Sequence, residues 1–111
     1  MQATIKVNGP SGPISRDVAA YQTGTPGLIV HRRVNPKGPS TGWVLTHHAS
    51  GLALSGYGFK TRAQAVAFAG VIASLADWTL DQRELRAVEG LYGRMSDARS
   101  RFDFELASSR S

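Results

Sequence analysis

Hydrophobic residues are grouped in three closely spaced segments of the chain, residues 28–34, 43–48 and 52–57. The first two are rich in β-branched and apolar residues, and the third alternates weakly between hydrophobic and polar residues. Turn-forming residues separate the segments, at 35–42 and at 49–51. Segments joined by such short connections predict an antiparallel three-stranded meander.

The two faces of this sheet differ in polarity, because successive side chains of a strand point to opposite faces. One face is apolar and is expected to carry Leu28, Val30, Val34, Trp43, Leu45, Leu52 and Leu54. The other is polar, basic and partly aromatic, with His31, Arg33, Thr46, His48, Ser55 and Tyr57. We expect the apolar face to pack on a helix and the polar face to remain exposed.

The N-terminal segment, residues 1–27, contains a mixture of strand, loop and helix signals. Alternation predicts a short strand at 4–7, and glycine and proline predict loops at 8–13 and 23–27. Between the loops, Ile14, Val18 and Tyr21 fit one helical stripe and Ser15 is a possible cap. We therefore expect one or two helical turns within 14–22.

A helix is predicted from Thr61 to Asp77. Thr61 is a favourable N-cap and Gln64 completes a capping box. Eleven of the 14 residues at 63–76 are apolar and none is charged, so more than one face of the helix should be covered. Small residues such as Gly70 and Ala73 would permit close approach by a second subunit.

The C-terminal part predicts a second helix and a short strand. Thr79 and Gln82 form another capping box, opening a helix to about Met95. Strict alternation at 101–106 favours a strand with one apolar side, although a continued helix is the alternative. The residues expected at a subunit or partner interface are Gly70, Ala73, Phe102, Phe104 and Leu106.

These elements define an α+β protein: a three- to four-stranded antiparallel sheet packed against an alanine-rich helix, with a second, C-terminal helix. We expect one domain over 1–111, with an N-terminal strand and loops at 1–27, a sheet–helix core at 28–78, and the second helix and tail at 79–111. The chain is 111 residues long, which is enough for one core and too little for two.

The amino-acid composition excludes several classes of function. The chain has no cysteine, which excludes disulfides, Cys-ligated metals and thiol catalysis. The start lacks the apolar region of a secretory signal, and the longest uncharged apolar run is too short to span a membrane. We expect a soluble cytoplasmic protein that does not bind membranes.

Positive charge is concentrated in the first two thirds of the chain. Residues 1–76 contain seven lysines and arginines against one acid, whereas residues 77–111 contain six arginines against seven acids. An unbalanced positive field favours polyanionic partners. By contrast, the sequence has no phosphate-binding loop and no nucleophilic-serine motif, and the histidines lack metal-ligand spacing. We expect no enzyme activity, no cofactor and no metal site.

The glycine–aromatic pair Gly58-Phe59 precedes Thr61 and the alanine-rich helix, after a small sheet. Residues 28–76 thereby resemble the arm-type DNA-binding domains of phage integrases, and are similar to plant ethylene-response-factor domains. In such domains the exposed face of the sheet enters the major groove. The resemblance therefore implies contacts from His31, Arg33, Thr46, His48 and Tyr57. Strand 52–54 lacks the basic residues of that pattern, the second helix is additional, and no recombinase domain is present.

These observations predict a small basic accessory protein that binds nucleic acid, of the kind encoded by phages or mobile elements. The alternative is a non-enzymatic protein-interaction or oligomerisation module, such as a homodimer. The residues expected to contact nucleic acid are Arg32, Arg33, Lys37, Lys60 and Arg62 for phosphates, and His31, His48 and Tyr57 for bases.

Overall fold

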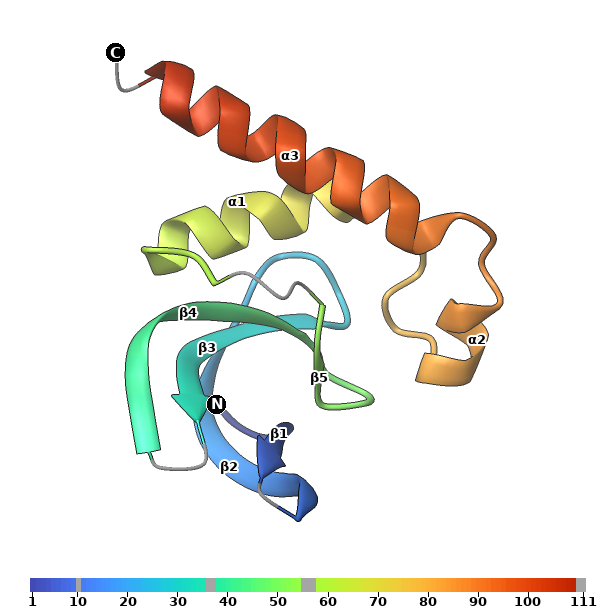
Figure 1. Cartoon of the computed structure of the whole chain (residues 1–111). Coiled ribbons are helices and arrows are strands. Elements are labelled where there is room, and N and C mark those ends of the chain that lie inside the picture. Colours follow the sequence, from blue (N-terminus) through green and yellow to red (C-terminus); the bar gives the residue numbers. More distant parts are fainter. Residues whose placement is uncertain (10, 36–37, 55–57, 110–111) are drawn as a thin grey trace.

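The computed structural model describes residues 1–9, 11–35, 38–54 and 58–109 of the chain (Figure 1). Within these residues five strands precede three helices, which confirms the predicted α+β class. The strands are β1 (Gln2–Gly9), β2 (Gly12–Gln22), β3 (Leu28–Asn35), β4 (Gly38–His47) and β5 (Leu52–Ala53). The helices are α1 (Arg62–Ile72), α2 (Gln82–Arg86) and α3 (Leu91–Ser109).

Each strand pairs antiparallel with the next, so the sheet is a meander in the order β1-β2-β3-β4-β5. The predicted meander corresponds to β3, β4 and β5. Strands β3 and β4 extend into the turn-rich segment 35–42, because Asn35 pairs with Gly38 and Val34 with Pro39. The predicted third strand is described only at Leu52–Ala53, and residues 55–57 lie outside the described residues.

The helical turns predicted within 14–22 are wrong, because this segment is strand β2. Its backbone pairs with β1 from Gln2↔Ala19 to Gly9↔Gly12, and its last residues pair with β3. Two neighbouring strands thus supply hydrogen bonds that outweigh a weak helical stripe, since strand preference depends on tertiary context. Residues 2–9 and 12–22 are consequently a strand pair of the sheet, whereas the loop predicted at 23–27 is confirmed as the connection between β2 and β3.

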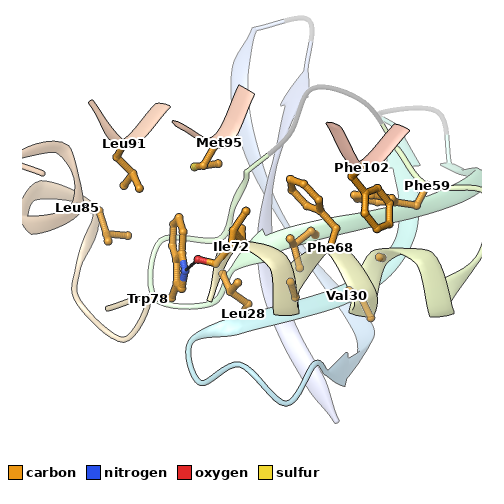
Figure 2. Packing of buried hydrophobic residues seen from close by; sticks show 13 residues of the cluster. Leu28, Val30, Phe59, Phe68, Ile72, Trp78, Leu85, Leu91, Met95 and Phe102 are labelled. Atoms are coloured by element: carbon orange, nitrogen blue, oxygen red, sulfur yellow. Dashed lines mark hydrogen bonds between the residues drawn. The ribbon is translucent and has the colours of Figure 1, made fainter. Parts of the chain in front are cut away.

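One face of the sheet packs on the helices, as predicted. Leu28, Val30 and Leu45 are buried against Phe68 and Ile72 of α1 (Figure 2). The other face is closed by the curl of the sheet, which brings β1 toward the β4–β5 turn (Figure 1). There the amide of Lys6 donates to the carbonyl of Gly51 at 2.8 Å.

The predicted start of α1 is confirmed and its predicted end is wrong. The Thr61 hydroxyl accepts a hydrogen bond from the Gln64 amide at 3.1 Å. The Gln64 side chain accepts from the amide of Lys60, one residue before the cap. The helix ends at Ile72 because the chain turns back there, and the indole N–H of Trp78 donates to the Ile72 carbonyl at 3.0 Å (Figure 2).

The predicted second helix is divided into α2 and α3. Thr79 is not its cap, since this residue bonds to Asp77 in a turn. Asp81 caps α2 instead, accepting from the Glu84 amide at 2.8 Å. The helical path breaks before α3 at Gly90, whose φ of 74° is a left-handed conformation that glycine adopts readily.

The tail is helical, so the predicted strand at 101–106 is wrong and the alternative, a continued helix, is correct. Phe102 is buried in the core, Leu106 is half-buried, and Phe104 is 72 % exposed on another side of α3. Phe102 therefore belongs to the chain's own core and is not an open interface residue. Gly70 and Ala73 are exposed on α1, and a Cβ added at Gly70 would meet no atom within 4 Å.

Candidate nucleic-acid interface

Two aromatic side chains meet on the face of the sheet that packs on the helices, next to the start of α1. Tyr21 lies on β2 opposite Val30, and Trp43 lies on β4 opposite Arg32. Because Val30 and Arg32 are two residues apart on β3, all four side chains share one face. The ring centroids of Tyr21 and Trp43 are 5.9 Å apart in an edge-on arrangement. Tyr21 remains 44 % exposed, whereas Trp43 is partly buried against the core, so the pair is partly open to solvent.

Two arginines stack on these rings. The Arg32 guanidinium carbon lies 5.1 Å from the Trp43 ring centroid. Arg62, the first residue of α1, lies 4.4 Å from the Tyr21 ring and 5.9 Å from the Trp43 ring. Neither arginine forms an ion pair with any residue in the described part of the chain. We call these four residues, Tyr21, Arg32, Trp43 and Arg62, the arginine–aromatic cluster.

Two further cations border the cluster. The backbones of Trp43 and Phe59 exchange two hydrogen bonds of 2.8 Å. Exposed Lys60 directly follows Phe59 in the chain and therefore lies near Trp43. The guanidinium of Arg33 lies beside Gly58, 3.7 Å from where a Cβ would stand. The fold thus brings Arg32, Arg33, Lys60 and Arg62 near one another. The sequence analysis predicted all four as phosphate contacts. Lys37 and Tyr57, also nominated, lie outside the described residues.

The prediction of an exposed polar sheet face is wrong for His31 and Thr46. Their exposed fractions are 2 % and 1 %, because this face is the one closed by the curl of the sheet. Ala3, Ala20 and Ile29 form a small apolar cluster on the same side. His31 therefore has no access to a base, and the described part of this face around His31 and Thr46 is too buried to insert into a groove of DNA.

His48 is exposed but lies away from the cluster. It directly follows β4, five residues after Trp43, and its amide donates to the carbonyl of Gly27 at 2.9 Å. Its side chain lines a hollow near β1 that Asp17 also lines. The structure therefore does not bring His48 together with the predicted phosphate-binding residues.

Buried His31 is held in its neutral form. Its Nδ1 lies 2.8 Å from the carbonyl oxygen of Arg32, which can only accept, so Nδ1 carries the proton. Its Nε2 then accepts from the Thr46 hydroxyl, also at 2.8 Å. Burial lowers the pKa of His31 below its usual 6.5, and the hydrogen bond to the Arg32 carbonyl opposes part of that shift.

This lowered pKa predicts that acid destabilises the fold. Between pH 6.5 and the lower folded-state pKa, the unfolded chain binds a proton at His31 that the folded chain does not. The melting temperature should therefore fall as the pH drops through this window. NMR titration of the His31 ring should show a midpoint below 6.5, and His48→Gln, which changes an exposed side chain, should retain the decline. A midpoint above 6.5 would contradict the prediction.

Arg99 is a further cation that the sequence did not single out. It stacks 4.0 Å from the Phe59 ring centroid and donates to the carbonyl of Gly58 at 2.9 Å. It also pairs with Asp103 at 3.0 Å. These contacts attach α3 to the segment that precedes α1, so we assign Arg99 a structural role.

Buried His47, like His31, has structural hydrogen-bond partners. The Nε2–H of buried His47 donates to the Leu80 carbonyl at 2.7 Å, and its Nδ1 accepts from the Ser50 hydroxyl at 2.8 Å. This side chain links β4 to the segment before α2. No three His, Asp or Glu side chains within the described ranges are placed to share a metal ion.

A groove of about 610 Å³ lies between β5 and the helices α2 and α3. Its lining is mixed: Trp78 and Leu85 are almost fully buried, whereas Tyr92 is exposed. Arg86 stands at the groove, but no residue of the arginine–aromatic cluster lines it. The groove and the cluster are therefore separate features.

Comparison of the chain with protein-family models, curated proteins and solved structures gives no match. None of the helices in the described residues is both long and apolar enough to cross a membrane. Function must therefore be argued from the surface itself.

Tyr21 and Trp43 are the site residues that sequence reasoning missed. Trp43 was placed on the apolar face, which is correct, but it is only partly buried there, beside Arg32 and Arg62. Tyr21 was assigned to a helical turn. No local pattern identifies it, because residues 18–21 are all hydrophobic; the alternation in which Val18 and Ala20 are more buried than Ala19 and Tyr21 arises only in the folded sheet.

Proposed function

We propose that this protein binds nucleic acid through the arginine–aromatic cluster and the cations beside it. The observation that carries the proposal is the stacking of Arg32 and Arg62 on two partly open aromatic rings, with no acidic partner among the described residues. Surfaces that bind single-stranded nucleic acid commonly combine basic side chains with aromatic side chains.

Stacking on the rings orients the two arginine side chains so that they can bind a phosphate group. A guanidinium that lies on a ring loses part of its freedom, while its N–H groups still point outward in a fork that matches two phosphate oxygens. Arg33 and Lys60 add positive charge at the segment 58–60, which pairs with Trp43 and precedes α1. The net charge of +5 supports the approach of a polyanion.

The test is a titration of labelled DNA and RNA, single-stranded and duplex, at two salt concentrations. Four phosphate contacts from Arg32, Arg33, Lys60 and Arg62 predict a log-affinity against log-salt slope of about −3.6 for duplex DNA. The double variant Arg32→Ala/Arg62→Ala should flatten that slope by up to about 1.8. Affinity at about 50 mM salt should fall at least about tenfold.

The matched control is Arg83→Ala/Arg86→Ala, which removes the same charge from the exposed side of α2. It should leave affinity and slope nearly unchanged. Equal weakening by both double variants would mean that only net charge matters, and would overturn the assignment to the cluster. Absence of any binding tighter than about 10⁻⁴ M at about 50 mM salt would overturn the function itself.

A protein-interaction or oligomerisation module is the second candidate, favoured by apolar side chains left open on the helices. Val71 on α1 and Tyr92 and Phe104 on α3 are all exposed. Light scattering of the same samples, with and without DNA, measures the mass of the protein. An oligomer that binds no nucleic acid would favour this second function.

A further inference from the structure

The rings of the arginine–aromatic cluster indicate which form of nucleic acid it binds. In a duplex the base faces are stacked on each other, so a side chain on a protein surface stacks only on an unpaired base. Tyr21 keeps 44 % of its surface exposed although Arg62 already lies over it. Part of the aromatic pair is therefore free to receive a base.

The size of the cluster is also suited to unpaired nucleotides. Its two ring centroids are 5.9 Å apart, and each arginine lies within 5.9 Å of a ring. A cation and a stacking surface thus stand close enough to serve the same nucleotide or its neighbour. A duplex-reading element, by contrast, must enter a major groove about 12 Å wide. The sheet face suited to that task is closed around His31 and Thr46.

We propose that the cluster binds unpaired nucleotides of single-stranded DNA or RNA, an inference that rests on the proposed function above. Tyr21 and Trp43 stack on bases, and Arg32 and Arg62 contact the adjoining phosphates. Recognition of this kind depends on the faces of the bases and tolerates different sequences.

The intrinsic fluorescence of the protein reports on this site. The chain has two tryptophans, Trp43 in the cluster and Trp78 in the core. Trp78 is only 2 % exposed and is hydrogen-bonded to Ile72, so a bound base cannot reach it. Quenching by oligo(dT) or oligo(rU) of about 15 nucleotides would therefore arise at Trp43.

We expect either oligonucleotide to bind at least about tenfold more tightly than a duplex of equal length, and to quench the fluorescence. Tyr21→Ala should weaken single-strand binding by about 5- to 150-fold, the usual loss for one stacked base, without altering the salt slope. Tyr21→Phe keeps the ring and should bind like the wild type. The matched control is Tyr92→Ala, which removes another exposed tyrosine, on α3, and should have no effect.

The outcomes separate the two proposals. Equal affinity for duplex and single strand, or unchanged single-strand affinity in Tyr21→Ala, would overturn the preference for unpaired bases and leave nucleic-acid binding intact. If no nucleic acid binds at all, the proposed function fails and this inference fails with it. Circular dichroism of Tyr21→Ala should match the wild type, since the replaced ring is at the surface.

Discussion

Gly27→Ala should destabilise the protein severely. A Cβ at this position would stand 2.1 Å from the carbonyl oxygen of Trp78 and 2.7 Å from the amide nitrogen of Thr79. Both are backbone atoms, so no side chain can rotate aside. The φ of 90° adds the cost of a left-handed conformation for a residue with a Cβ. Together these effects predict a loss of roughly 2–5 kcal/mol in the free energy of unfolding.

Gly24→Ala is the matched control in the same β2–β3 connection. Its φ is 83°, but a Cβ there would meet no atom within 4 Å. It should therefore lose only the conformational term, about 1–2 kcal/mol. Urea unfolding of both variants measures the difference. Equal losses would show that Gly27 is required only for its backbone angle, and that the contact with Trp78 is not limiting.

Phe102→Ala should cost about 3–5 kcal/mol, as expected for an aromatic side chain removed from a packed core. Phe102 is only 8 % exposed, and its ring centroid lies 5.4 Å from that of Phe68 and 6.1 Å from that of Phe59. These contacts fasten the C-terminal half of α3 to α1 and to the segment before it. Their loss leaves a cavity between the helices and the sheet.

Phe104→Ala is the control, two residues further along α3. Its side chain is 72 % exposed, so its replacement should change stability by less than about 0.5 kcal/mol. A strand at 101–106 would place both rings on one face and give similar losses. Thermal unfolding of the two variants thus distinguishes the helix from the strand. Comparable destabilisation by both would contradict the helical tail.

The sequence by itself determined the elements whose signals are local. Residues 28–34 and 43–47 are rich in apolar and β-branched residues, and they form strands. Thr61 and Gln64 mark the start of α1, because a cap is a contact between residues three apart. The apolar face with Leu28, Val30 and Leu45 also followed from parity.

The predictions from local pattern were wrong where the residues fitted both the helical period and the strand period. Segment 14–22 has a weak helical stripe, yet β1 and β3 flank it and supply its hydrogen bonds. Segment 101–106 alternates strictly, yet Phe102 and Leu106 are also four residues apart and pack together on one side of α3. In both cases contacts distant in sequence chose between periods that the sequence left open.

Only the tertiary structure decided which side of the sheet is available. Parity separates two faces, but burial of the polar one depends on the curl that carries β1 to Gly51, 45 residues from Lys6 in the sequence. The same curl places Tyr21 beside Trp43 and the N-terminal end of α1. His31 was thereby buried, and Arg32 and Arg62 were brought to the same pair of aromatic rings. Residue types and charge are written in the sequence, whereas such proximity arises only when long-range pairing fixes the strands in space.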